Sequence, residues 1–464
     1  MTVIYKAPSP KIEVYSPIDY SLLLTLSPEG DFPYLLSYSF TESIQDMVGS
    51  FNFSIAGGNN SLFDTLKPLH IIKIYEGLTK PSFVGVITHK NISTSMTDKG
   101  VKRSISFSGK SVTSFIAEFQ LILDLKLLSA GRKVLHAQTV QEDFILGLNE
   151  LQSATPLKIG DFLRKTWELY LKYTGIGKPS SNTPVHGKAG GANIAVYNII
   201  NAFMGSSFFE VGNAEKIPLP IANTFFNQDI NTIIQIWQCI LAPPVYEMFS
   251  RVNVDGMPKV VVRETPFDSS VWKTLNITTI KASELIDYSL NLSNEEVYTT
   301  YLAYLEGSQL DANQYIVINA ADAKTKNESI FAIDDQKFEM YGLRMCQVNF
   351  RGYSKVEDDD TIIATMAKYS KRLKEWFSHL DEMYVGSITI VNRFDGKDKV
   401  RIGERVKFLG GEFYVRNATH SFSYGQAPTI SLQVIRGAKY TKEGVFSGVL
   451  ENVGTTRVEL NDED

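Results

Sequence analysis

The sequence predicts a multidomain α+β protein, with an antiparallel β-domain toward each end of the chain and a largely helical middle segment. Three observations lead to this fold class. Apolar and polar residues alternate near both ends, apolar residues recur every three or four positions in the middle, and two distant β-segments resemble each other. The chain of 464 residues is also long enough for about three domains.

The overall composition excludes several classes of function. A formal charge of -5 and a pI of about 5.8 provide no broad basic surface for gripping nucleic acid. Cys239 and Cys346 stand far apart, so the sequence indicates neither a disulfide framework nor a sulfur metal site. The most apolar run, "FIAEFQLILDLKLL", is interrupted by Glu118, Asp124 and Lys126 and is not expected to span a membrane.

The first half of the chain changes from a strand pattern to a helix pattern. Residues 1–34 form an N-terminal extension, and residues 35–110 form the first part of a β-domain with segments such as "LLSYSFTES" and "GSFNFSIAG". Residues 111–244 form a mainly helical middle domain. Its segment "DINTIIQIWQCILAPP" carries one apolar stripe and ends where Pro243 and Pro244 stop the helix.

Strand patterns return in the second half. Residues 245–304 form a β-rich segment that leads into the second β-domain, and its strands are joined by the turn "DG". Residues 305–340 are polar and are expected to be an exposed insertion. The second β-domain covers residues 341–440 and contains a long helix over 361–384, and residues 441–464 form an acidic tail.

The long helix has apolar residues at alternating spacings of four and three. This spacing is typical of a helix packed on its own domain's sheet, and an intersubunit coiled coil is the alternative. The residues are Ile362, Met366, Tyr369, Leu373, Trp376, Leu380 and Met383.

One β-segment recurs near both ends of the chain. The segment "LKPLHIIKIYEG" (66–77) aligns without a gap on "VRIGERVKFLGG" (400–411). A turn shorter by three residues then places Thr88-His89 on Thr419-His420 and Ser104 on Ser431. Internal duplication explains this order, and the common pattern of β-hairpins is the alternative.

A duplicated β-unit has a consequence for assembly. Three copies related by rotation close a ring through head-to-tail contacts, and two similar domains per copy give that ring pseudo-sixfold symmetry. Linking edge strands around the ring would satisfy backbone groups that an open sheet leaves unpaired.

Several segments, taken in order, resemble a known family. They are "YEMFSRVNVDGMPKVVVRETPFD" (246–268) with its core Arg263-Glu264-Thr265-Pro266-Phe267, "EMYVGSITI" and "VRIGERV" between 382 and 406, and the closing "FYVRNATHSFSYGQAPTISLQVIRG". The early "GSFNFSI" and "FVGVITH" fit as well. The chain resembles the baseplate hub proteins of tailed phages and contractile injection systems, the late control protein D-like tail hub family.

The resemblance implies a virion structural protein of the phage tail. It implies a homotrimer with two tube-like β-domains per chain, which joins the sixfold tail tube to a threefold central spike or tail tip. The implied partners are the chain itself, the tail tube protein, the spike or tip protein, the tape-measure protein and other baseplate proteins, with DNA only as passing cargo. The implied location is the virion tail baseplate, or a phage-like injection particle, made in the host bacterial cytoplasm.

The sequence contains no pattern for catalysis, a cofactor or a metal. The histidines have no close ligand spacing, and no nucleophile elbow is present. His89 and His420 are expected to bond backbone carbonyls at strand ends. The chain is therefore expected not to be an enzyme. The alternatives are a tail-associated peptidoglycan hydrolase, a glycan-binding tail-tip protein, and a tip protein of a noncontractile tail.

The candidate functional residues belong to an interface. Arg263 lies in a strand-like stretch and could hold a carboxylate across a domain or subunit joint by two hydrogen bonds, so that replacing it with Ala would weaken trimers. The alternative is an exposed Arg on an edge strand that Pro266 terminates. The full candidate set is Arg263, Thr265, Pro266, Phe267, Arg401 and Arg436.

Overall fold

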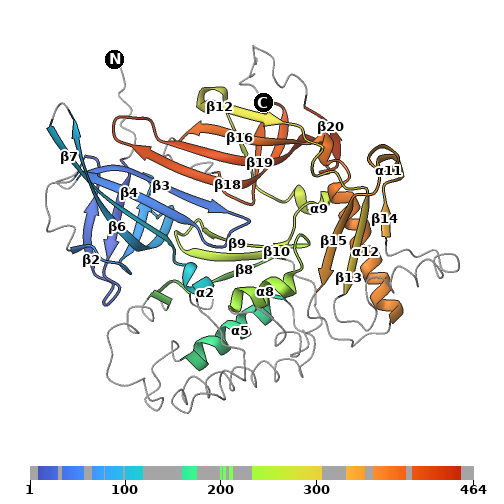
Figure 1. Cartoon of the computed structure of the whole chain (residues 1–464), viewed down its shortest axis with the longest axis horizontal. Coiled ribbons are helices and arrows are strands. Elements are labelled where there is room, and N and C mark those ends of the chain that lie inside the picture. The colour runs from blue at the N-terminus through green and yellow to red at the C-terminus, as the bar shows by residue number, and fades with distance from the viewer. Residues whose placement is uncertain are drawn as a thin grey trace.

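The computed structural model shows a chain that is mostly antiparallel β-sheet with few helices (Figure 1). Its largest sheet has 14 strands and spans both ends of the sequence. The structure describes residues 9–29, 34–56, 65–77, 79–97, 100–118, 159–174, 199–200, 202–204, 208–212, 232–305, 331–350, 359–392 and 400–450.

The first β-unit contains the strands of residues 11–111. Its strand order in the sheet is β3-β4-β7-β6-β5-β1-β2. Apolar residues alternate with polar ones along β3 and β4, which buries one face of each strand. The strands are β1 (Lys11–Tyr15), β2 (Leu22–Leu26), β3 (Leu35–Ser43), β4 (Ser50–Ala56), β5 (Ile71–Tyr75), β6 (Phe83–Thr97) and β7 (Gly100–Ser111).

The second β-unit is built from later parts of the chain. Its main order is β12-β16-β19-β18, β17 pairs with β18, and β11 pairs with β17. Leu409 and Gly410 connect β17 to β18, both with positive φ, as a tight hairpin turn requires. The strands are β11 (Ile277–Thr279), β12 (Leu285–Asn291), β16 (Tyr384–Val391), β17 (Arg405–Phe408), β18 (Gly411–Ser423), β19 (Thr429–Tyr440) and the short β20 (Phe446–Gly448) paired with β19.

A three-stranded sheet and helices pack below the large sheet (Figure 1). The order of this sheet is β8-β10-β9, and β9 and β10 form the hairpin that the turn "DG" predicts. The helix α8 begins with a capping box, because Thr232 accepts from the Gln235 backbone and Gln235 accepts from the Thr232 backbone. The elements are β8 (Phe209–Val211), β9 (Tyr246–Val252), β10 (Pro258–Glu264), α2 (Ser114–Glu118), α5 (Ile159–Thr174), α8 (Ile233–Leu241) and α9 (Ser269–Trp272).

A second small sheet, β14-β13-β15, carries the long helix α12. The helix packs on β13 of its own chain, where Ser370 Oγ accepts a hydrogen bond from the Ala303 backbone N–H. The elements are β13 (Thr300–Leu305), β14 (Phe331–Ile333), α11 (Asp335–Tyr341), β15 (Met345–Phe350) and α12 (Asp359–Phe377).

The helix ends earlier than the sequence pattern predicts. It runs over Asp359–Phe377 instead of 361–384, and a short 3-10 turn at Leu380–Glu382 leads into β16. Met383 keeps the expected spacing and is buried, but it is buried in the turn before the strand. Apolar spacing alone therefore does not show where this helix stops.

Part of the predicted organisation lies outside the described residues. This applies to 306–330 of the expected insertion, to 119–158 and 175–198 of the expected helical domain, and to 451–464 of the acidic tail.

The buried apolar residues form three clusters. One lies within the first β-unit, and one lies within the second, where Phe249 and Val261 of the hairpin join it. The third and largest contains the helices of the middle segment and continues to Trp376 of α12. The hairpin β9–β10 therefore belongs to the cores on both sides of it.

Phe40 of β3 provides a test of how the β-units are held together. Its ring centroid lies 4.4 Å from that of His420 and 5.1 Å from that of Phe83, and the side chain is buried. Phe40→Ala is expected to lower the free energy of unfolding by about 3–5 kcal/mol, measured by urea denaturation. The control Ser39→Ala, on the other face of β3, should lower it by about 1 kcal/mol or less; equal losses would contradict this packing role.

Candidate functional site

The most informative site is the joint where β3 of the first β-unit pairs with β18 of the second. The pairing is antiparallel and runs from Ser43 opposite Asn417 to Ser37 opposite Ser423. The hydroxyl oxygens of Thr41 and Thr419 lie 3.0 Å apart across it. Backbone hydrogen bonds thus join the two β-units into one continuous sheet (Figure 1).

Aromatic rings cover the buried face of this joint. His420 stacks on Phe40, and Phe422 stacks on Tyr38 with centroids 5.6 Å apart. Stacked pairs add stabilisation beyond the area they bury. One face of the sheet at the joint is therefore apolar and the other is polar, as in each of its two strands.

A buried polar group fixes the joint from within. His420 Nδ1 lies 3.0 Å from Glu76 Oε1, and the two side chains are only 1% and 3% exposed. Asn392 Nδ2 donates to the same oxygen at 2.9 Å. The prediction that His420 bonds a backbone carbonyl is wrong, because the fold brings Glu76 to it from the far side of the sequence. The exposed His89 instead lies 2.8 Å from the Thr88 hydroxyl.

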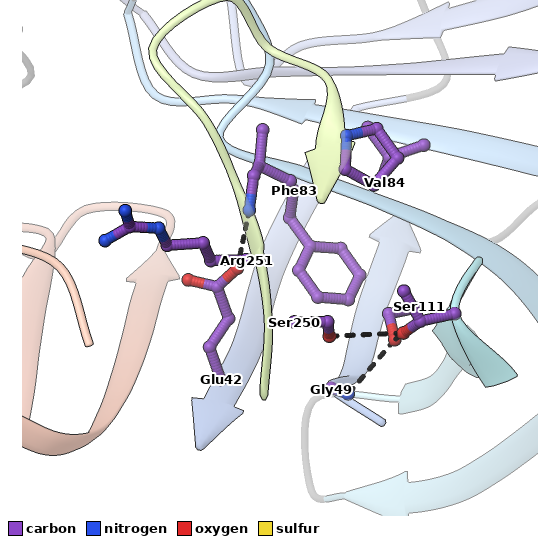
Figure 2. Close-up of a pocket in the computed structure, with 10 residues that line it drawn as sticks. Glu42, Gly49, Phe83, Val84, Ser111, Ser250 and Arg251 are labelled. Carbon is purple, nitrogen blue, oxygen red and sulfur yellow. Dashed lines mark hydrogen bonds between the residues drawn. The ribbon is translucent and has the colours of Figure 1, made fainter. Parts of the chain in front are cut away.

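The hairpin β9–β10 packs beneath the joint, and a small pocket lies between the hairpin and the first β-unit (Figure 2). Ser250 donates to the Met47 carbonyl at 2.7 Å and accepts from Thr113 at 3.1 Å. The Val252 backbone N–H donates to Glu42 of β3 at 3.2 Å. The polar groups of the pocket are thus used to dock the hairpin on the first β-unit.

Arg251 connects the same hairpin to the second β-unit. Figure 2 shows its side chain directed away from the pocket. Its guanidinium contacts Glu404 at 3.2 Å and Glu210 at 3.1 Å, and the Arg251 and Glu404 side chains are about one-tenth exposed. The hairpin therefore holds both β-units at once.

Arg263 holds a carboxylate within its own hairpin and reaches across the joint to a carbonyl and a hydroxyl of the second β-unit, all within one chain. Its Nε donates to Glu247 Oε1 at 2.6 Å, and its terminal nitrogen donates to the Gly403 carbonyl at 2.6 Å and to the Tyr414 hydroxyl at 3.0 Å. Tyr414 in turn donates to Glu247 at 2.8 Å. Arg263 and Glu247 lie on paired strands of the hairpin, whereas Gly403 and Tyr414 belong to the second β-unit.

The environment of this trio changes its ionisation. Burial raises the pKa of Glu247, because its charged form loses hydration, and the Arg263 guanidinium opposes that shift. Burial alone would lower the pKa of Arg263, but the adjacent Glu247 carboxylate raises it above its usual value. Burial also raises the pKa of Tyr414 well above its usual value. Arg263 and Glu247 therefore form a charged pair, and the charge of each depends on the presence of the other.

The other predicted interface residues lie close to this trio, with one exception. Thr265 donates to the Pro244 carbonyl, Pro266 is buried, and the guanidinium of Arg436 lies 4.1 Å from the centroid of the Phe267 ring. Arg401 is half-buried in the connection before β17, outside this cluster. Their role in an interface between copies stays a prediction.

The two β-units have the same strand order and share two irregularities of register, while the second unit has further ones near Tyr384 and Glu412. β3, β4, β7, β6 and β5 correspond to β12, β16, β19, β18 and β17. The register skips one residue between Leu35 and Ser37 and likewise between Leu285 and Asp287. β6 and β18 skip one residue between Ile87 and His89 and between Val415 and Asn417.

This register corrects one part of the sequence alignment. The pairs Ile74–Phe83 and Phe408–Gly411 end corresponding hairpin ladders, which agrees with the match of 66–77 to 400–411. The connection 409–410 is much shorter than 75–82, so that Thr88-His89 corresponds to Arg416-Asn417 instead of Thr419-His420. Ser104 likewise corresponds to Thr429.

A second match was missed in the sequence. The segments "LLSYSFTES" (35–43) and "LIDYSLNLS" (285–293) align without a gap and share Tyr38 with Tyr288 and Ser39 with Ser289. They form β3 and β12, the corresponding edge strands of the two units. In both segments, two large apolar residues and one polar residue precede "YS", and this shared pattern could have revealed the match from the sequence.

The strand edges that correspond to β3 and β18 are those of β12 and the outer part of β6. Within the described residues, neither edge has a strand partner. β12 pairs with β16 along one edge, and no described strand lies along its other edge. β5 pairs with β6 only as far as Val86, so that no described strand lies on that side of β6 from Asn91 onward. Unpaired edges of this kind are sites for pairing with another chain.

The uncovered face of the continuous sheet is rich in hydroxyl and amide groups. These side chains alternate with buried ones, and several bond across strands, as Ser37 does with Ser54 at 2.6 Å and Asn52 with Ser39 at 2.8 Å. This hydroxyl face comprises Ser37, Ser39, Thr41, Ser50, Asn52, Ser54, Ser104, Ser106, Ser108, Asn417, Thr419, Ser421, Thr429, Ser431, Ser387 and Thr389.

Within the described ranges, no group of three or more His, Cys, Asp or Glu side chains is arranged to hold a metal ion. In the same part of the chain, every helix is too short or too polar to cross a membrane.

Arg263→Ala tests the charged pair. The variant is expected to lose about 3–5 kcal/mol of unfolding free energy, because Glu247 is left buried without its cation. The pKa of Glu247 should then rise further, so the deficit should be larger at pH 8 than at pH 5, where protonation removes the unpaired charge. The control Arg164→Ala breaks only the exposed contact with Asp161 and should cost about 0.5 kcal/mol or less. A pH-independent deficit would contradict the assignment.

No family model matches the sequence. No curated protein matches it either. Among solved structures, the chain is similar to the 43 kDa tail protein of prophage MuSo2 from Shewanella oneidensis, at 10% identity and a TM-score of 0.48, covering 94% of this chain and 100% of that one. It is also similar to a tail protein of Neisseria meningitidis MC58, at 11% identity and a TM-score of 0.49, covering 94% and 99%. A third is an E. coli type VI secretion component at 8% identity and a TM-score of 0.36, covering 91% and 79%.

Proposed function

We propose that this chain is a structural baseplate hub, of which three copies close into a ring that joins a sixfold tail tube to a threefold spike or tail tip. The observation that carries the proposal is the β3–β18 joint between two units of equal strand order. The pairing of β3 with β18 within one chain can be repeated between copies. The reason is that β12, which corresponds to β3, and the outer part of β6, which corresponds to that of β18, are edges in the described sheet.

Internal duplication explains the shared strand order. Two separate strand pairs carry the same skipped residue at corresponding positions, and β-bulges are built features that related sheets keep. The common sequence pattern of β-hairpins does not account for two bulges in each unit at matching places. Three copies then present six similar units, which matches the symmetry of a tube made of six subunits per layer.

The hydroxyl face suits the wall of the central opening. Within the described residues, the buried face of the sheet packs on strands of the first β-unit itself and on the hairpin beneath the second, so the hydroxyl face is the opposite face and is proposed to line the passage. Its hydroxyl and amide side chains are neutral and the same face also carries Lys110 and Asp287, so it has no strong net attraction or repulsion for DNA. Passing cargo would therefore meet hydroxyl groups with few fixed charges.

The hairpin has a supporting role in this proposal. Arg251, Arg263 and the cluster of Phe267 and Arg436 hold the second β-unit against the hairpin and so fix the angle between the units. Three copies close a ring only if that angle is the same in each. Tail tube, spike and tape-measure proteins are the proposed partners of the two ring faces.

The mass of the purified chain in solution tests this function. The expected result is three copies of the 51.9 kDa chain, and image averages along the symmetry axis should show six similar lobes around an opening. A monomer that persists at micromolar concentration would contradict the ring. Release of dye from labelled peptidoglycan by the purified chain would instead support the hydrolase alternative.

A further inference from the structure

We infer that β12 of one copy pairs antiparallel with the outer part of β6 of the next copy, in the register that places Asn291 opposite Asn91 and Ser289 opposite Ser93. The inference rests on the proposed ring and goes further, because it names the strands, the direction and the register of the contact. It follows from three steps, each taken from the strand pairing of a single chain.

The first step matches β12 to β3. Both strands pair with the corresponding neighbour, and both skip the second residue of the strand. This match places Leu290 at the position of Phe40 and Ser289 at the position of Ser39. The identical spacing of "YS" in both segments agrees with it.

The second step matches the outer part of β6 to that of β18. The skipped residues Thr88 and Arg416 coincide, so that Asn91 takes the position of Thr419 and Ser93 that of Ser421. Ile92 then takes the position of His420. A one-residue error would move every side chain to the other face, and the shared bulge excludes it.

The third step transfers the internal register to the contact between copies. Thr419 lies opposite Thr41, and Ser421 opposite Ser39. The transferred pairs are Asn91 with Asn291, Ile92 with Leu290, Ser93 with Ser289, and Thr94 with Tyr288.

The chemistry of these pairs is complementary. Amide faces amide where the internal joint pairs two hydroxyls, and small hydroxyl residues face each other at Ser93 and Ser289. Ile92 is 43% exposed in the single chain and would be covered by Leu290. No pair in this register brings like charges together. An apolar residue on an unpaired edge is a hazard unless the edge has a partner, and this register supplies one.

Paired cysteines test the register directly. The double variant Ser93→Cys with Ser289→Cys should form disulfides between copies on mild oxidation, giving covalent dimers and trimers but nothing larger on a non-reducing gel. Each single variant should stay monomeric on the gel. The shifted pair Ser93→Cys with Asn291→Cys should cross-link much more slowly, because two residues along a strand move the sulfurs apart.

Native mass separates failure of the register from failure of the ring. Trimers by mass with no cross-link at Ser93 and Ser289, or with equal cross-linking of the shifted pair, would overturn the register and leave the ring standing. Monomers by mass would overturn both.

A charge at Ile92 gives an independent measurement. Ile92→Asp should raise the dissociation constant of the trimer by about tenfold or more, because the carboxylate would face Leu290 of the next copy. Its thermal unfolding as a monomer should be unchanged. The matched control Val254→Asp alters an apolar residue that is 66% exposed in the hairpin turn, and it should leave assembly unchanged. Equal effects of the two variants would overturn the inference.

Discussion

The backbone pairing of β3 with β18 is the interaction on which the arrangement of the molecule depends. A strand has two edges, and β18 uses one for β19 and divides the other between β17 and β3. This division is available because β17 stops at Phe408, so that the rest of β18 is open to another strand. The same shortness of β5 leaves the outer part of β6 open, which is the physical basis of the proposed ring.

Charged and polar groups placed below the joint fix its angle. Arg263 with Glu247 and Arg251 with Glu404 are largely buried pairs, and such pairs require both partners to be present in good geometry. Arg251 reaches the second β-unit directly at Glu404, and Arg263, held by Glu247 of its own hairpin, reaches that unit at Gly403 and Tyr414. Apolar packing of Phe249 and Val261 provides the adhesion, while the ion pairs limit the hairpin to one position.

The sequence predicted what depends on local patterns. Alternation identified β3 to β7 of the first unit and the long strands of the second, but not β1 and β2, which lie in residues expected to form an extension. Apolar spacing identified helices in the middle segment, including α8, and most of α12. It could not show that Glu76 meets His420, because only the folded sheet brings together residues so far apart in the chain. It identified Arg263 as a residue that binds a carboxylate, yet a strand Arg before Pro gives no sign that this carboxylate, Glu247, lies on the neighbouring strand of the same hairpin. The alignment failed after residue 77 because the lengths of turns are not fixed by the strands that they connect.

The internal joint and the inferred contact between copies have different side chains for a physical reason. The internal joint forms once, as the chain folds, and can therefore bury an ionisable pair and a set of aromatic rings around Phe40. A surface that meets another copy must first stay soluble in water, so a cluster of exposed aromatic rings there would promote aggregation, and Tyr288 packs instead on Phe408 of its own unit. Asn91, Ser93 and Thr94 keep that edge soluble, and Ile92 alone adds apolar contact. Two edges with matching bulges can therefore carry different side chains.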